Sequence, residues 1–357
     1  MAIHLHEKWN PTMVKGFTRG SILASRLTTQ FKWDGVRAII ISSPVTVAPH
    51  DYNRNGGNNR FGTINDVQDT AQRMEVTQDK CWILSIDAGN ASEQQKEKKA
   101  AEIMVAQTNE QDIPYAEKHA FKKIAHLAGK IVGSATALTA ANITTRISAG
   151  LAHMNGKSVN SENRTIYINS AGYQLLVDSG KTLYASRGIV DKAWAKGKVD
   201  EYGGADVVLV PDDRWPAHLN FLIVQKQAAC MPYKLKNTRI MEDVGIDGDV
   251  LRNHYIFDAF VIGRKCDGVY ADVFTGTNGG TVLAAPTMSV DGKATQANAG
   301  VIYVTTDGSD PRYSISRVAV ASGAAPTHTA GDTVKAVAMG ATDAVFASPV
   351  AEIVTTS

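Results

Sequence analysis

The stretch RAIIISSPVTVAP, from Arg37 to Pro49, decides how the rest of the chain is interpreted. It is rich in β-branched residues and ends at a Pro-His-Asp corner, so it predicts a strand. A second segment, QRMEVTQDKCWILSID from Gln72 to Asp87, carries apolar residues at the two-residue period of a sheet face. The pattern therefore predicts a long hairpin that spans residues 37–87.

The turn of this hairpin falls in DYNRNGGNNRFG, from Asp51 to Gly62. Its Asn and Gly residues tolerate the positive φ angles of a tight reversal. A two-stranded hairpin of this length is at best marginal alone in water, because it has nothing on which to bury its apolar face. We therefore expect another body to cover it, with a neighbouring copy of the chain as the first candidate.

A long helix is predicted over residues 91–128. Ser92 and Gln95 form a capping-box pattern at its start. Apolar residues at spacings of three, four and seven form one stripe along it, while lysines face water; the stripe contains Ile103, Ala106, Ile113, Ala120, Ile124 and Leu127. An interior Pro114 costs roughly 3 kcal/mol, so a kink or two abutting helices are expected there.

The following residues, 130–275, mix helices and strands of unequal length. Thr139 is the expected cap of a helix that ends at Asn155-Gly156, and its stripe is Ile143, Ile147, Leu151 and Met154. The predicted strands are RTIYI followed by a short helix, ADVVLVP, LNFLIVQKQAACMP with a Gln-Lys break, and YIFDAFVIG. This irregular order predicts an α+β fold and not a βαβ repeat.

The composition changes near Gly276. Residues 276–281 have the Gly, Thr and Asn content of a flexible linker. Beyond it, the sequence contains three predicted short strands between turns: VIYVTTDGSDP, DTVKAVAMG and PVAEIVTT. This pattern predicts a small all-β sandwich over residues 282–357.

Composition excludes several classes of protein. The 357 residues are 44% hydrophobic with a formal charge of +2 and no basic block, which does not favour a dedicated nucleic-acid binder. The three cysteines, Cys81, Cys230 and Cys266, are widely spaced and favour reduced thiols in a cytoplasmic setting. The start of the chain lacks an apolar signal core, and no membrane span is predicted.

Candidate chemical sites are weak. His4 and His6 favour a mobile terminus over a metal site, and Trp9 and Trp33 are expected to anchor residues 1–34 as an arm. Gly56-Gly57 lacks the continuation of a phosphate loop. Solvated turns explain the acidic residues of the hairpin and of TTDGSDP more simply than carboxylate catalysis or cation binding; these residues are Asp51, Asp66, Asp69, Asp79, Asp307 and Asp310. We predict no catalytic residue, no cofactor and no metal.

The motif order carries a resemblance. Residues 1–275 resemble the major capsid protein of tailed bacteriophages in two places. The first is DYNR followed by NRFG, a hydrophobic return strand and a long helix. The second is IDGDVLRNHYIFDAFVIGRKCDGVY, from Ile246 to Tyr270. The resemblance implies an N-terminal arm (1–34) and a capsid core (35–275). Within the core it implies an extended loop (37–87), a spine helix (91–128), and peripheral and axial domains (130–275).

The capsid resemblance also implies a function. The chain would form hexamers and pentamers of an icosahedral head around double-stranded DNA, assembled in the host bacterial cytoplasm with portal and separate scaffolding proteins. In some family members a loop lysine forms an isopeptide crosslink, but the tip here has arginines and no lysine. The contact residues expected at the loop tip are Asp51, Tyr52, Asn53, Arg54, Asn59, Arg60 and Phe61.

The C-terminal strands carry a second resemblance. TTDGSDP, TVKAVA and the closing SPVAE are similar to the immunoglobulin-like C-terminal domain of chitobiase and β-hexosaminidase enzymes. This resemblance leaves open the alternative of a carbohydrate-directed protein, and the capsid resemblance leaves open a bacterial nanocompartment shell with the same fold. Tyr303 and Phe346 are assigned to the core of the sandwich itself, which leaves Tyr313 as the residue to stack a sugar. We expect the sandwich on the outer face of a shell and dispensable for closure.

Overall fold

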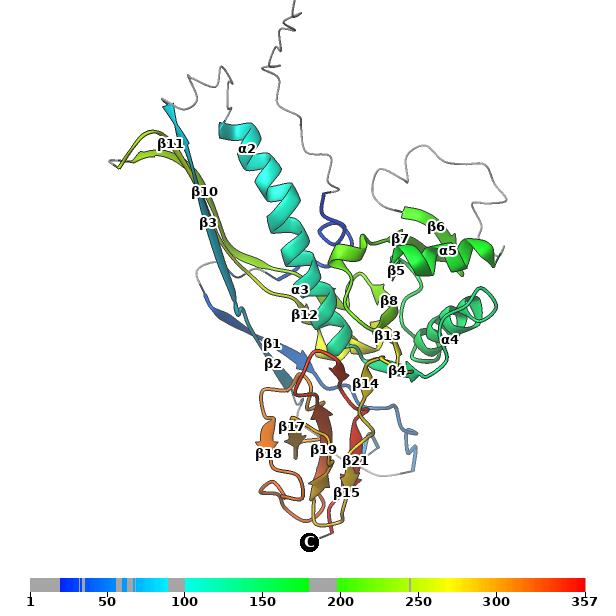
Figure 1. Cartoon of the computed structure of the whole chain (residues 1–357). Coiled ribbons are helices and arrows are strands. Elements are labelled where there is room, and N and C mark those ends of the chain that lie inside the picture. The colour runs from blue at the N-terminus through cyan, green and yellow to red at the C-terminus, as the bar shows by residue number, and fades with distance from the viewer. Residues whose placement is uncertain are drawn as a thin grey trace, which may run out of the picture.

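The structure is a computed structural model that describes residues 20–31, 33, 36–55, 60–62, 67, 69–88, 100–179, 198–243 and 245–356. Helices and strands alternate irregularly within these ranges, so the α+β prediction is confirmed. Figure 1 shows a long helix through the middle of the molecule, with one sheet along it, a second sheet with two helices beside it, and the C-terminal strands at its lower end.

A six-stranded mixed sheet forms the largest body, in the order β4-β13-β8-β5-β7-β6. Its strands are β4 (Lys130–Ser134), β5 (Arg164–Ile168), β6 (Lys198–Tyr202), β7 (Ala205–Leu209), β8 (Leu219–Gln225) and β13 (Val269–Phe274). The pairs β13–β4 and β5–β7 are parallel, and the other pairs are antiparallel. Every residue of RTIYI in β5 is buried, because both faces of the sheet are covered.

Helices α4 (Ile143–Gly156) and α5 (Ser170–Asp178) cover one face, where Ile147 packs with Ile166 and Ile223. Tyr167, one residue along β5, points to the opposite face and joins the cluster that contains Phe121 of the long helix. The predicted stripe of α4 is confirmed as buried. Its predicted cap is wrong, because the helix starts one turn later with Asn142 at the N-cap, and the Asn142 side chain accepts a hydrogen bond from the Thr139 amide at 2.8 Å.

The long helix runs as α2 (Ala100–Gln107), a π-helical segment (Thr108–Asp112) and α3 (Ile113–His126). Ser92 and Gln95, the predicted caps, lie outside the described residues. Pro114 lies in the first turn of α3, directly after the π segment, where the Ile113 amide bonds to the Thr108 carbonyl. The interruption expected at the proline is thus a change of hydrogen-bond pattern and not a break into two helices.

A three-stranded antiparallel sheet lies along this helix in the order β10-β11-β3. Its strands are β3 (Gln78–Asp87), β10 (Tyr233–Asp243) and β11 (Ile246–Phe257). The segment after β8 continues as β9 (Ala229–Cys230), which pairs with β12 (Phe260–Val261), so the predicted strand with a Gln-Lys break is two strands. Two 3-10 helices, Asp212–Arg214 and Gly263–Gly268, complete this part.

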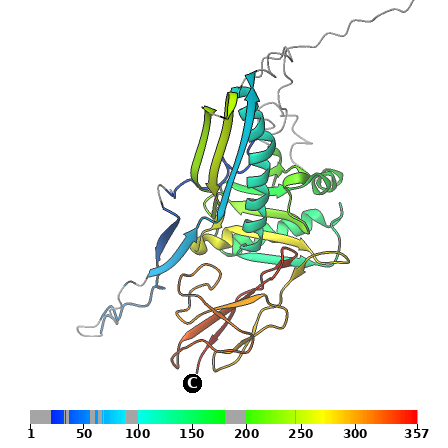
Figure 2. The same cartoon turned by 60° about the vertical axis from the view of Figure 1, so that its left-hand side comes forward.

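The hairpin prediction is wrong in one respect. The first strand, β1 (Ala38–Pro44), pairs with β2 (Asp69–Glu75), but the predicted return strand breaks after Glu75 and its second half is β3, which pairs with β11. The break falls at Thr77, whose amide and hydroxyl both donate to buried Asp258. Figure 2 shows the β1–β2 hairpin extending away from the body of the molecule.

The described part of the arm packs on the core as expected. Ile22, Leu23 and Leu27 are buried in the cluster beneath the six-stranded sheet. Trp33 is 2% exposed and stacks on Phe260 with ring centroids 5.6 Å apart. His4, His6 and Trp9 lie outside the described residues.

The C-terminal residues form a small all-β unit. Each of the three predicted strand segments contains a strand of the antiparallel sheet β18-β17-β19-β21, and short pairs β14–β20 and β15–β16 accompany it. The bounds are β14 (Thr281–Val282), β15 (Thr287–Met288), β16 (Ala294–Thr295), β17 (Val301–Thr305), β18 (Val318–Val320), β19 (Thr333–Met339), β20 (Val345–Phe346) and β21 (Ala351–Val354). Ile302 and Val304 pack with Leu283 and Val334 in a core of its own.

The connection to this unit is hydrogen-bonded at both of its ends, unlike the flexible joint that its composition predicts. The Thr275 amide donates to Ser134, the Gly280 amide to Phe274 and the Thr281 amide to Ala344, at 2.8 to 2.9 Å. Gly276 is packed so closely that a Cβ there would lie 2.6 Å from the Ala135 carbonyl oxygen. Glycine composition therefore reflects close packing here and not freedom of movement.

Candidate subunit-contact surfaces

The tip of the β1–β2 hairpin is closed by its own polar groups. The Asn53 amide donates to the Arg60 carbonyl at 3.1 Å, and the Asn53 side chain accepts from the Asn55 amide at 3.1 Å. The His50 ring contacts the Phe61 carbonyl at 2.7 Å, a role that the sequence did not indicate. Six of the seven predicted contact residues are thus gathered at one loop end, and Asn59 lies outside the described residues.

The tip is almost fully exposed. Tyr52 and Phe61 contact each other edge to face at 4.9 Å, yet Phe61 is 78% exposed. Val47, nearby along the chain, is 82% exposed. Asp51, Asn53, Arg54 and Arg60 are also exposed. An apolar surface offered by a thin loop in one subunit is typical of a contact site for another molecule.

A second exposed surface lies at the N-terminal end of the long helix. Helix α2 has no buried residue, although its sequence AAEIMVAQ is mostly apolar. Val105 is 60% exposed, and Ile83 of β3 is 66% exposed. Close packing of the helix against the three-stranded sheet starts at buried Asp112. Its carboxylate accepts hydrogen bonds from the Trp82 indole at 2.9 Å and from the Asn253 side chain at 2.8 Å.

Two buried carboxylates hold helix α3 against the elements around it. Glu117, 1% exposed, pairs with buried Arg214 at 2.7 Å and accepts hydrogen bonds from Ser21 and Leu23 of the arm. Glu117 lies on the apolar stripe of the helix, between Ile113 and Ala120, so its position was a sequence signal of a buried charge. This pair joins the arm, the helix and the turn before β8.

Asp258, fully buried, has a similar role where β11 ends. His119 and Lys123 of α3 contact one oxygen at 2.9 and 2.6 Å, and Thr77 donates to the other. Burial by itself raises the pKa of this carboxyl, but the bonds from His119, Lys123 and Thr77 outweigh it and hold the pKa well below its usual range. An acidic residue inside the apolar run YIFDAFVIG was the sequence signal.

Chemistry of a catalytic kind has little support in the described residues. Burial raises the pKa of the Cys230 thiol to about 12 and that of Cys266 to about 11, so neither is a ready nucleophile. The described part of the chain holds no group of three or more His, Cys, Asp or Glu residues placed to bind a metal ion. Among the described helices, none has both the length and the apolar character needed to cross a bilayer.

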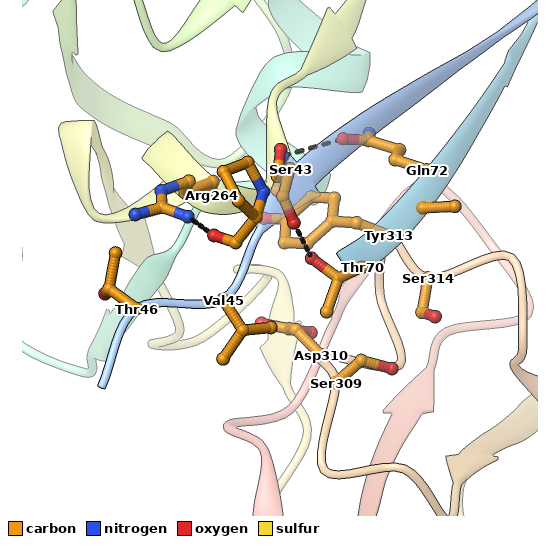
Figure 3. A pocket seen from close by; sticks show the side chains of 13 residues that line it. Ser43, Val45, Thr46, Thr70, Gln72, Arg264, Ser309, Asp310, Tyr313 and Ser314 are labelled. Atoms are coloured by element: carbon orange, nitrogen blue, oxygen red, sulfur yellow. Dashed lines mark hydrogen bonds between the residues drawn. The ribbon is translucent and has the colours of Figure 1, made fainter. Parts of the chain in front are cut away.

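The turn interpretation of TTDGSDP is confirmed. Asp307 accepts from the Ser309 amide at 2.9 Å, and Asp310 accepts from the Arg312 amide at 2.9 Å, both as Asx turns. Asp310 also lines a cavity of about 310 Å³ between the hairpin base and the C-terminal unit (Figure 3). The cavity wall contains hydroxyls of Ser43, Thr70 and Ser314.

The structure does not support Tyr313 as a sugar platform. Tyr313 is 6% exposed, its ring lies in the main core cluster, and its hydroxyl donates to the Leu127 carbonyl. A ring in this position has no free face on which a sugar could stack. Phe346 also belongs to the main core and not to a separate sandwich core, whereas Tyr303 is half-buried beneath the Arg317 guanidinium at 4.4 Å.

Comparison with family models and with curated proteins gives no match. Comparison with solved structures gives several phage structures. A chain from Mycobacterium phage Che8 has a TM-score of 0.59 at 16% identity, over 78% of this chain and 100% of that chain. The capsid of Cyanophage P-SCSP1u gives 0.61 at 12% identity over 76% and 93% of the two chains, and the mature capsid of bacteriophage PhiM1 gives 0.59 at 17% over 77% and 93%. This chain therefore has the fold of these phage capsid structures.

Proposed function

We propose that this chain is a major capsid protein of a tailed bacteriophage, a structural subunit and not an enzyme. It assembles with copies of itself into hexamers and pentamers of an icosahedral head that encloses double-stranded DNA. Three lines of support agree: the fold of the solved phage capsids, the residues at the hairpin tip, and the exposed apolar end of the long helix.

The observation that carries the proposal is the exposure of apolar side chains on elements that are packed against the rest of the subunit. Phe61 and Val47 on the hairpin, and Val105 on α2, are at least 60% exposed. Strand β2 of the hairpin contributes Met74 to a smaller buried cluster, and the long helix contributes Ile124 to the main core. A stable monomer gains nothing from such projections. A subunit that meets several neighbours in a closed shell buries them, and symmetry repeats each contact many times.

The charge distribution supports a placement of the two parts in the particle. Residues 282–357 carry six acidic and four basic residues, a formal charge of −2, so the remainder of the chain carries +4. Contact with packaged DNA favours the more basic part on the inner face, and the acidic unit on the outer face. We further propose that this unit has an immunoglobulin-like fold. We expect portal and scaffolding partners and assembly in the host bacterial cytoplasm.

Electron microscopy of the purified, concentrated protein tests the proposal. Closed shells tens of nanometres across are expected. The proposal is contradicted if the protein stays monomeric at every protein and salt concentration. This result must hold both for the protein without scaffolding or portal protein and for the protein co-expressed with a scaffolding partner.

The hairpin tip gives a sharper test. Arginine forms bidentate pairs with carboxylates, so we expect Arg54 and Arg60 to meet acidic groups of an adjacent subunit. The double reversal Arg54→Glu and Arg60→Glu should prevent assembly or lower particle stability, while the melting temperature of the subunit changes little. Lys293→Glu, an exposed reversal in the C-terminal unit, is the matched control. Double-reversal particles with normal thermal stability would refute the contact.

A further inference from the structure

We infer that the C-terminal unit is a structural part of the subunit, because its loop Asp310–Ile315, here called the clamp loop, closes the end of the long helix and fixes the base of the hairpin. The expectation from sequence was that residues 282–357 are an addition to the core and dispensable for shell closure; the inference concerns the first point only. The inference concerns the fold of a single subunit and does not depend on whether that subunit forms a shell.

The first part of the clamp acts at the C-terminal end of α3. Leu127 is the C-cap residue of α3, and Ala128 and Gly129 follow it directly. A buried carbonyl group outside a helix or a sheet needs a hydrogen-bond donor from elsewhere. The Tyr313 hydroxyl donates to the Leu127 carbonyl, and the Arg312 Nη1 donates to the carbonyls of Ala128 and Gly129, each at 2.9 Å. The cation also lies at the negative pole of the helix dipole, where positive charge is stabilising.

Arg312 is itself held in place. Its Nε and Nη2 atoms donate to the Asp310 carboxylate at 3.1 and 2.6 Å, and only 9% of its surface is exposed. A guanidinium with paired bonds on one edge and two carbonyl acceptors on the other has a fixed orientation. The Asp310 turn therefore positions Arg312 for the helix end.

The second part of the clamp acts at the hairpin base. The Ile315 amide donates to the Ala71 carbonyl of β2 at 2.9 Å, and Ser314 forms an antiparallel bridge with Gln72. The Gln72 side chain accepts from the Gly263 amide and donates to the Val261 carbonyl, both at 2.8 Å. Figure 3 shows Tyr313 and Ser314 next to Thr70 and Gln72 at this junction. The clamp loop thus adds to the edge of β2.

Apolar contacts complete the junction. Tyr313 and Phe346 both belong to the core cluster shared with the helix and the six-stranded sheet. Phe346 stacks on His126 with ring centroids 4.3 Å apart and an angle of 3° between the ring planes. A Cβ at Gly263 would lie 2.9 Å from the Tyr313 Cβ, so the fit is close on the opposite side as well. Two aromatic residues of the C-terminal unit are therefore part of the main core.

Hydrogen exchange on the full-length protein tests the clamp. In Arg312→Ala, amides in residues 124–134 and 69–75 should exchange about tenfold faster, because bonds from a charged donor are lost. Lys293→Ala, which removes an exposed cation of the same unit, should leave both segments unchanged. Faster exchange in both segments with an intact C-terminal sheet is the expected result.

A conservative variant keeps the test decisive if Arg312→Ala fails to fold. Tyr313→Phe retains the ring and removes only the hydroxyl, so it should fold, melt at a lower temperature and exchange faster in residues 124–134. If both variants match the Lys293→Ala control in melting temperature and in exchange, the C-terminal unit is an independent module and the inference is overturned. Shell formation by any of these variants is measured separately and bears only on the proposed function.

Discussion

The two ends of the long helix differ in what surrounds them. At the C-terminal end, Ile124 is 1% exposed and the following carbonyls are bound by Arg312 and Tyr313. At the N-terminal end, α2 buries no residue and Val105 is 60% exposed. The described part of the helix therefore starts with exposed apolar side chains and ends in a closed core.

For the shell subunit that we propose, this difference separates two tasks. Helices in proteins are stabilised mostly by packing of an apolar face, so the buried end supplies the stability of the single subunit. The open end contributes little to that stability and is available to neighbours. Substitutions at the two ends should thus affect different measurements, and the predictions below begin with the largest effect.

The buried carboxylate at the closed end should matter most. Glu117→Ala removes the carboxylate that pairs with buried Arg214 and that accepts hydrogen bonds from the arm, and breaking such a buried pair costs about 3–5 kcal/mol. Chemical denaturation of the subunit measures this change. Glu102→Ala, an exposed acid on α2 of the same helix, should change the free energy of unfolding by no more than about 0.5 kcal/mol. Equal effects at the two positions would remove the distinction between the ends.

Asp258 gives a smaller effect that depends on pH. Because its folded-state pKa lies below the unfolded value of about 3.9, its contribution is complete above that pH and is lost as the pH falls toward the folded-state value. Asp258→Asn should lower stability at pH 7 by about 2–3 kcal/mol, since bonds from His119 and Lys123 lose their charged acceptor.

Urea unfolding from pH 7 to pH 3 checks this prediction. The difference in the free energy of unfolding between the parent and Asp258→Asn should be constant down to about pH 4 and then narrow. A difference that stays the same at pH 3, or that widens, would show that the carboxylate is not held in its charged form by these partners.

Local patterns predicted much of the closed part of the molecule. The stripe of α4, the strand β5 and the three C-terminal strands follow from residue patterns within short segments, whereas the burial of every residue of β5 was not predicted. The hairpin tip followed from its Asn and Gly residues. The buried charges were missed, although Glu117 on an apolar stripe was a visible signal.

Pairing between distant segments was not predictable in the same way. The partner of β3 is β11, which lies more than 150 residues later, so no local pattern could show that the return strand would leave β1. The prediction that Tyr313 is free to stack a sugar is not supported, for a related reason. The neighbours of Tyr313 in sequence are turn residues, and only the packed structure shows that the turn inserts its ring into the core of another region.

The smallest effect on folding, and the one that most directly separates the two tasks, is expected at Val105. Val105→Ser replaces a side chain that is already 60% exposed, so subunit unfolding should change by no more than about 0.5 kcal/mol. In a shell, where a neighbour covers this surface, the same change removes two buried methyl groups and buries a hydroxyl. Each contact loses on the order of 1 kcal/mol, and symmetry repeats the loss in every subunit. The concentration needed for assembly, measured by light scattering, should therefore rise while the melting temperature of the subunit stays the same. Ile124→Ser at the closed end should do the opposite and lower subunit stability first. If Val105→Ser assembles at the parental concentration, the open end of the helix is not a contact surface.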